Sequence, residues 1–253
     1  MVHLGPLPGS PRWGGSMEAV LARATRDART LAGEGIDGLI VENFGDTPYT
    51  PGRVDGVTVA AMAVVITAVR ETAPEIPLGV NVLRADTRSA LGLAVVTGAR
   101  FVRTNLLTGA LVTDQGLISS DAYEALRERR SMGAEVSLLA DVLSKHAVPL
   151  GSETTIELEA RAAAYRGLAD GLIVSGEETG FSADASDLQR VRGAVPDRPV
   201  LIGSGLDPEN LESLLPLSNG AILGTALKVD GETEGPVDAE RVRRIVKLAR
   251  TFR

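Results

Sequence analysis

Seven polar side chains stand at the carboxyl ends of short apolar runs, where together they could act on a ligand. Bulky apolar residues alternate with them, so all seven are predicted to face the same side of a sheet. Glu42 and Asp141 could transfer protons, and Arg103 could stabilise developing negative charge. The remaining four are predicted to bind substrate; the seven residues are His3, Glu42, Asn81, Arg103, Asn105, Asp141 and Ser175.

Two glycine-containing turns near the end of the chain have the composition of a phosphate site. They are Gly203-Ser204-Gly205 and Gly224-Thr225-Ala226, and each follows an apolar run. Glycine lets the backbone approach an anion closely, so that N–H groups can donate to it. The hydroxyl groups of Ser204 and Thr225 would add donors. The predicted phosphate-binding residues are Gly203, Ser204, Gly205, Gly224 and Thr225.

Lys145 and His146 follow the apolar run that ends at Asp141. The lysine could polarise a carbonyl or neutralise phosphate, and the histidine could move protons near neutral pH. If Lys145 forms a Schiff base, the reaction is aldolase-like. The alternative is a solvated pair in a loop. Asp114, in the glycine-bounded segment 109–116, is predicted to reach back over the same pocket.

Eight short apolar runs alternate with longer amphipathic stretches, which is the pattern of repeated βα units around a parallel sheet. Most of the runs have no polar face, as expected of strands covered by helices. The predicted strands are Val2–Leu4, Leu39–Glu42, Leu78–Val82, Phe101–Asn105, Val136–Asp141, Leu172–Ser175, Val200–Gly203 and Ala221–Leu223.

These units predict an α/β fold with a single (β/α)₈ TIM-barrel domain over residues 1–253. An open doubly wound sheet is the rival, but Gly5-Pro6-Leu7-Pro8-Gly9 stands where a Gly-x-Gly-x-x-Gly turn would be required. In a barrel, function gathers at the carboxyl ends of the strands, and the loops after strands seven and eight form a recurrent phosphate site. Buried Glu42, Arg103 and Asp141 could instead form an internal salt-bridge network. We favour a ligand site, because branched apolar residues normally fill the layers that stabilise such barrels.

Composition excludes several classes of function. The chain of 253 residues has 26 Lys+Arg against 33 Asp+Glu, a formal charge of −7, which argues against a nucleic-acid partner. With no cysteine, it has neither disulfides nor thiolate metal sites. No transmembrane segment and no signal peptide are predicted, so a cytoplasmic location is expected. A homo-oligomer is left open.

No cofactor is predicted from the spacing of the ligand-type residues. A divalent metal remains an alternative, since nitrogen and oxygen ligands suit such ions. Its ligands would be His3, Glu42, Asp141 and His146. No helical His-x-x-x-His spacing supports it.

The stretches VHLGPLPGSPRWGGS, VENFGDTPY, LGVNVLRAD, FVRTNLLTGALVTDQGLI, ADVLSKHA and IGSGLDPENL occur in this order and span nearly the whole chain. Together they resemble the BtpA family, which is named for a photosystem I biogenesis protein and includes nucleosidase-like SgcQ proteins. The resemblance implies a TIM barrel related to the ribulose-phosphate-binding superfamily. It also implies functional positions within these motifs, namely His3, Glu42, Asn43, Asn81, Arg103, Asn105, Asp114, Asp141, Lys145 and His146. Peripheral membrane association is implied only by analogy with the cyanobacterial member.

The residues and the resemblance together predict an enzyme that acts on a small phosphorylated sugar or nucleoside-like metabolite, by lyase, isomerase or nucleosidase chemistry. The alternative is a non-catalytic factor that stabilises a membrane protein complex such as photosystem I. A third reading is a sensor that binds a phosphorylated ligand without turnover. On the first reading, Arg103→Ala is predicted to abolish ligand binding and leave the fold nearly intact.

Overall fold

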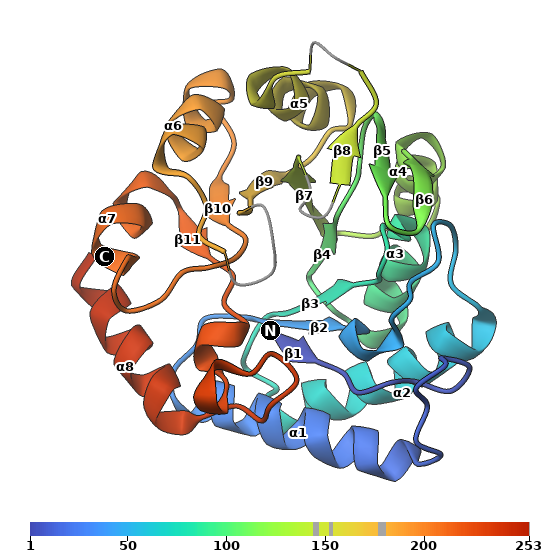
Figure 1. The fold of residues 1–253 in the computed structure, drawn as a ribbon. Coiled ribbons are helices and arrows are strands. Elements are labelled where there is room, and N and C mark those ends of the chain that lie inside the picture. Colours follow the sequence, from blue (N-terminus) through green and yellow to red (C-terminus); the bar gives the residue numbers. More distant parts are fainter. Residues whose placement is uncertain (144–146, 152–153, 177–180, 253) are drawn as a thin grey trace.

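An eight-stranded parallel sheet curls round on itself, with helices on its outside (Figure 1). The structure is a computed structural model that describes residues 1–143, 147–151, 154–176 and 181–252. The strands pair in chain order. Each predicted strand is present, with ends that differ by no more than two residues. The strands are β1 (Val2–His3), β2 (Leu39–Glu42), β3 (Leu78–Asn81), β4 (Phe101–Thr104), β7 (Ser137–Val142), β9 (Gly171–Val174), β10 (Val200–Ile202) and β11 (Gly220–Ala221).

The first and last strands of this sheet are brought together by the start of the chain. The ladder of strand pairs runs from β1 to β11. The Met1 amine then donates a hydrogen bond of 2.7 Å to the carbonyl oxygen of Leu223, just beyond β11. A curled parallel sheet with this order fits an α/β barrel.

A helix follows each strand or strand group, and the caps explain where several of them begin. Ser16 accepts from the N–H of Ala19, Thr155 from Leu158 and Asp238 from Glu240 and Arg241. The helices are α1 (Met17–Gly33), α2 (Gly56–Thr72), α3 (Thr87–Thr97), α4 (Ala122–Ser131), α5 (Ile156–Arg161), α6 (Ala185–Ala194), α7 (Leu211–Leu214) and α8 (Ala239–Ala249). No described helix has the length and apolarity needed to cross a membrane.

Alternation along the strands separates an apolar layer from a polar one inside the sheet. Ile40, Ile173 and Ile222 are buried in one interior cluster, against which Phe101 and Leu139 pack. Two residues further along their strands, Ile40 is followed by Glu42, Phe101 by Arg103 and Leu139 by Asp141. Because side chains repeat with a period of two, these charged groups lie directly above the apolar layer, at the carboxyl ends of the strands.

A glycine leaves room for the largest member of the apolar layer. A Cβ atom on Gly79 would lie 2.2 Å from the ring of Phe101. We expect Gly79→Ala to lower the free energy of unfolding by about 1–3 kcal/mol, because overpacking forces the ring or the strand to shift. Urea denaturation measures this change.

Gly92→Ala is the matched control, because a Cβ on Gly92, in helix α3, would meet no atom within 4 Å. Alanine there should stabilise the helix by about 0.5–1 kcal/mol. Equal effects of the two substitutions would contradict the packing assigned to Phe101.

A second, antiparallel sheet was not predicted. Strands β5 (Ala110–Thr113), β6 (Gly116–Ser119) and β8 (Ala147–Pro149) pair in the order β6-β5-β8. They lie in the connections that follow β4 and β7, and Figure 1 shows them on one side of the curled sheet. Leu111 and Ile118 are buried on one face of this small sheet, while Val112 and Leu117 are exposed on the other. Segments this short and weakly alternating carry little strand signal.

Candidate functional site

A pocket of about 680 Å³ opens at the carboxyl ends of the parallel strands. The pocket is lined by residues of five of these strands or of the turns directly after them. Residues of the hairpin turn between β5 and β6 and of the loops after β2 and β3 also line it. Its polar lining residues include His3, Glu42, Tyr49, Arg84, Arg103, Asn105, Asp114, Ser204, Asp207 and Thr225.

Arg103 and Asp141 form a buried two-point ion pair at the base of this site. The Nε of Arg103 donates to Oδ1 of Asp141 at 2.9 Å, and Nη2 donates to Oδ2 at 3.0 Å. The Arg103 side chain is 4% exposed and that of Asp141 is 0% exposed. Burial alone would lower the pKa of Arg103, but the Asp141 carboxylate and the nearby Glu42 raise it on balance. The guanidinium therefore stays charged and is held in one orientation.

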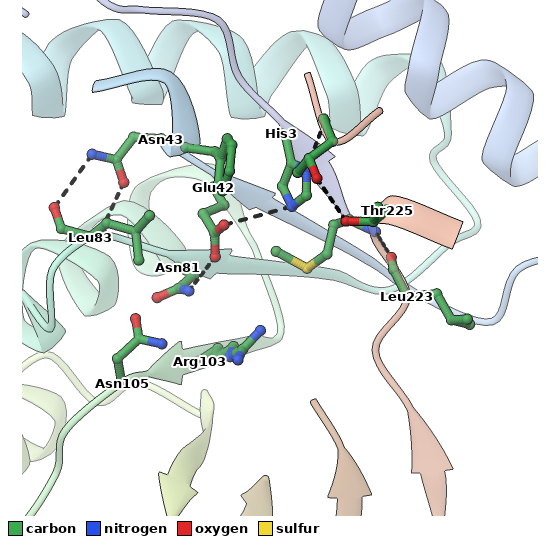
Figure 2. A network of polar contacts seen from close by, with 12 residues as sticks. His3, Glu42, Asn43, Asn81, Leu83, Arg103, Asn105, Leu223 and Thr225 are labelled. Atoms are coloured by element: carbon green, nitrogen blue, oxygen red, sulfur yellow. Dashed lines mark hydrogen bonds and ion pairs between the residues drawn. The ribbon is translucent and has the colours of Figure 1, made fainter. Parts of the chain in front are cut away.

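Glu42 lies between a histidine and an amide (Figure 2). The Nδ2 group of Asn81 donates to Oε2 of Glu42, and Nε2 of His3 lies 3.7 Å from Oε1. The His3 ring stacks on Phe44, with the ring centroids 4.6 Å apart. Its Nδ1 lies 3.5 Å from the carbonyl oxygen of Thr233. This arrangement fixes a carboxylate and an imidazole side by side, a pair able to relay a proton.

Three polar atoms in this region are buried and have no hydrogen-bond partner among the described residues. They are Oδ1 of Asn81, Oδ1 of Asn105 and Oγ of Ser175. The Nδ2 of Asn105 donates to Oδ2 of Asp141 at 2.8 Å, so only its oxygen end is unpartnered. Since most buried polar groups in proteins are paired, such a group of unpaired atoms is typical of a binding site.

The residues of the glycine turns after β10 and β11 line the pocket, and several of their backbone N–H groups have no acceptor among the described residues. Within the described ranges, the N–H groups of Ser204, Gly205, Gly224 and Thr225 donate to no protein acceptor. A Cβ on Gly203 would lie 2.3 Å from Oγ of Ser175 and 3.5 Å from Nη2 of Arg103. The Arg103 guanidinium therefore lies next to the first turn. Four backbone donors and one arginine suit an anion.

The hydroxyl groups of these turns also make hydrogen bonds within the protein. Oγ of Ser204 accepts from the N–H of Gly176 and donates to the carbonyl of Phe181, each at 3.2 Å. Oγ1 of Thr225 hydrogen-bonds to Oγ1 of Thr233 at 2.8 Å. Both hydroxyls therefore tie neighbouring segments together, and their predicted part in binding phosphate stays a prediction.

Asn43 also differs from its predicted role as a substrate ligand. Its Oδ1 accepts from the N–H of Leu83 at 2.8 Å, and its Nδ2 donates to Asp46 at 3.1 Å. The side chain is 1% exposed, so it joins the loops after β2 and β3. In the structure it positions the pocket wall.

Of the remaining predicted site residues, one lines the pocket and two lie outside the described residues. Asp114 lines the pocket from the hairpin turn between β5 and β6. Lys145 and His146 lie outside the described residues, so their predicted roles stay predictions. Sequence reasoning missed Phe44 and Tyr49, which belong to the motif VENFGDTPY. The Tyr49 hydroxyl donates to the carbonyl of Phe44 at 2.7 Å, and burial raises the pKa of Tyr49.

The alternative of a divalent metal site has no group of suitable ligands in the described part of the chain. No three acidic or histidine side chains there are arranged to hold a metal ion. Both oxygens of Asp141 accept from Arg103 or Asn105 instead.

Comparison with known proteins places the chain among close relatives. The model of the BtpA family matches residues 1–251. The photosystem I biogenesis protein BtpA of Synechocystis is 44% identical over 247 residues, which cover 98% of this chain and 85% of the relative. An uncharacterized protein of Thermococcus kodakarensis is 43% identical and covers 100% of this chain and 95% of its own. An uncharacterized mitochondrial protein of Caenorhabditis elegans is 32% identical, with coverage of 100% and 92%.

Solved structures share the fold at low sequence identity. Thiamine phosphate pyrophosphorylase from Pyrococcus furiosus superposes with a TM-score of 0.60 and 14% identity, covering 90% of each chain. Phosphoribosyl anthranilate isomerase from Thermus thermophilus gives a TM-score of 0.56 and 14% identity, covering 90% of this chain and 95% of the isomerase. These likenesses support the α/β-barrel architecture.

Proposed function

Since the chain belongs to the BtpA family, we propose that it is a single-domain (β/α)₈-barrel enzyme that acts on a small phosphorylated sugar or nucleoside-like metabolite. The observation that carries the proposal is the Arg103 guanidinium, held by Asp141 beside the Gly203 turn at the base of the pocket. A charged group this deeply buried is costly unless it pairs or meets a ligand. Arg103 is paired with Asp141, and its place beside the Gly203 turn suits it to meet a ligand as well.

The phosphate is bound by the backbone of the two glycine turns. The N–H groups of Ser204, Gly205, Gly224 and Thr225 donate to its oxygens, as in the phosphate sites after strands seven and eight of other barrels. Arg103 lies between this end of the pocket and the carboxylates. It therefore neutralises negative charge on the phosphate or on a reacting oxygen.

Proton transfer falls to the pair formed by His3 and Glu42. Their side chains lie 3.7 Å apart and both face the pocket. One member removes a proton from the substrate and the other returns one, as lyase, isomerase and nucleosidase reactions all require. Lys145 and His146 are further candidates for catalysis, and a Schiff base at Lys145 remains the aldolase-like variant of the proposal.

The distribution of relatives favours a metabolic role. Archaeal and nematode proteins match almost the full chain at 43% and 32% identity. These organisms carry no photosystem, so we expect the activity that the relatives share not to depend on one. A cytoplasmic location is part of this proposal.

A second candidate function is the non-catalytic support of a membrane protein complex. The name of the Synechocystis relative, which is 44% identical, favours it. The two candidate functions differ in whether the protein converts a bound metabolite into a product. If phosphorylated sugars and nucleotides bind but remain chemically unchanged, as followed by phosphorus and proton NMR over hours, the enzyme proposal is wrong.

Gly224→Ala tests the phosphate end of the pocket. The added Cβ would lie 2.9 Å from Cε1 of His3 and would crowd the second glycine turn. We expect the variant to lose at least tenfold in affinity for phosphorylated metabolites, measured as a smaller rise in melting temperature across a metabolite panel.

Gly14→Ala is the matched control, because a Cβ there meets no atom within 4 Å. It should bind the panel as the unmodified protein does. If no phosphorylated compound raises the melting temperature of the unmodified protein, the proposed function fails.

A further inference from the structure

The amide orientations of Asn81 and Asn105 are fixed by their neighbours. The Nδ2 of Asn81 donates to Glu42, and the Nδ2 of Asn105 donates to Asp141 at 2.8 Å. A carboxylate oxygen only accepts hydrogen bonds, so each amide must turn its nitrogen toward it. The opposite end of each amide is therefore a carbonyl oxygen, which can only accept.

These two oxygens are buried without a donor. Asn81 is 0% exposed and Asn105 is 7% exposed, and neither Oδ1 has a partner in the described parts of the protein. Figure 2 shows both amides near Glu42 and Arg103, with Asn81 at the end of β3 and Asn105 directly after the adjacent strand β4. Asn105 lines the pocket directly, whereas Asn81 lies behind Glu42 and orients it.

The pocket wall at Glu42 and Asn105, with Asn81 and Asp141 behind it, thus offers acceptors in excess. Arg103 is a strong donor next to this wall, and two of its nitrogens are already used by Asp141. A ligand that meets this wall must bring hydrogen-bond donors of its own. A carboxylate would instead face the oxygens of Glu42 and Asn105 and would be repelled.

Resting on the proposed function, we propose that the substrate is a polyhydroxylated sugar phosphate and that Asn105 determines this specificity. The phosphate binds at the glycine turns. Hydroxyl groups at the far end donate to Oδ1 of Asn105 and to Glu42. A phosphorylated carboxylic acid of similar size is excluded because it supplies acceptors where the wall needs donors. A site that pairs with a substrate hydroxyl rejects analogues that lack it.

Isothermal titration calorimetry with three probes tests the inference: ribose 5-phosphate, 2-deoxyribose 5-phosphate and phosphoglycolate. For the unmodified protein we expect ribose 5-phosphate to bind at least tenfold more tightly than phosphoglycolate, with the deoxy compound between them. In Asn105→Ala the preference for ribose 5-phosphate over phosphoglycolate should fall to threefold or less.

Asn219→Ala is the control. Asn219 accepts from the N–H of Val200, at the end of β10 away from the pocket, so the substitution should leave the pocket unchanged. It should keep the full preference. If Asn105→Ala fails to fold, the preference of the unmodified protein for ribose 5-phosphate over phosphoglycolate still tests the substrate class. Equal or tighter binding of phosphoglycolate would overturn the inference and leave the proposed function standing. If none of the three probes binds, the inference is overturned, and the metabolite panel described above decides separately on the proposed function.

Discussion

Arg103→Ala is expected to abolish the binding of phosphorylated metabolites and to lower the free energy of unfolding by about 3–5 kcal/mol. The first effect follows from the place of the guanidinium beside the Gly203 turn. The second follows because Asp141, whose side chain is 0% exposed, would keep a buried charge with Asn105 as its remaining side-chain partner among the described residues. Titration calorimetry and urea denaturation measure the two effects separately.

A double variant separates binding from stability. In Arg103→Met with Asp141→Leu, both charges are gone, so most of the lost stability should return. Binding should not return, because the anion no longer meets a cation. An Arg103→Ala protein that still binds phosphorylated compounds with unchanged affinity would remove this arginine from the site.

Asp27→Ala is expected to destabilise the protein by about 3–5 kcal/mol without a direct effect on the pocket. Nζ of Lys228 lies 3.0 Å from Oδ2 of Asp27, and the side chains are 0% and 1% exposed. Asp27 also accepts from the N–H of Val237 at 3.2 Å, which ties α1 to the segment before α8. Burial lowers the pKa of Lys228 although Asp27 opposes the shift, so losing Asp27 should lower it further.

An exposed ion pair provides the control for this substitution. Arg243 and Glu34 also form a two-point pair, but the Arg243 side chain is 65% exposed. Glu34→Ala should change the free energy of unfolding by less than about 1 kcal/mol. The double variant Asp27→Leu with Lys228→Met should recover most of the loss. A single Asp27→Ala variant as stable as the Glu34→Ala control would contradict the assigned pairing.

The strands and the side of the sheet on which polar groups gather were predictable from the sequence. Continuous apolar runs mark buried parallel strands, and alternation within them assigns Glu42, Arg103 and Asp141 to the interior. Both signals come from residues that are neighbours in the sequence, so they can be recognised without knowing which distant residues are in contact. The structure accordingly has all eight strands, with Ile40, Phe101 and Leu139 beneath the three charged groups.

Pairings between distant residues were not predictable in the same way. The sequence suggested that Arg103→Ala would leave the fold nearly intact, because nothing local shows that Asp141, 38 residues away, accepts from both Nε and Nη2 of the guanidinium. Asp27 and Lys228 are 201 residues apart, and each looks like an ordinary polar residue of a helix or loop. The hydroxyls of Ser204 and Thr225 were predicted as phosphate ligands, and the sequence did not show that they also bond to Gly176 and Thr233.

A crystal structure of the protein with ribose 5-phosphate tests the central claim most directly. We expect the phosphate to lie against the N–H groups of Ser204, Gly205, Gly224 and Thr225, with Arg103 in contact and the sugar hydroxyls facing Asn105. A phosphate bound elsewhere at saturating concentration, with both glycine turns unoccupied, would contradict the account.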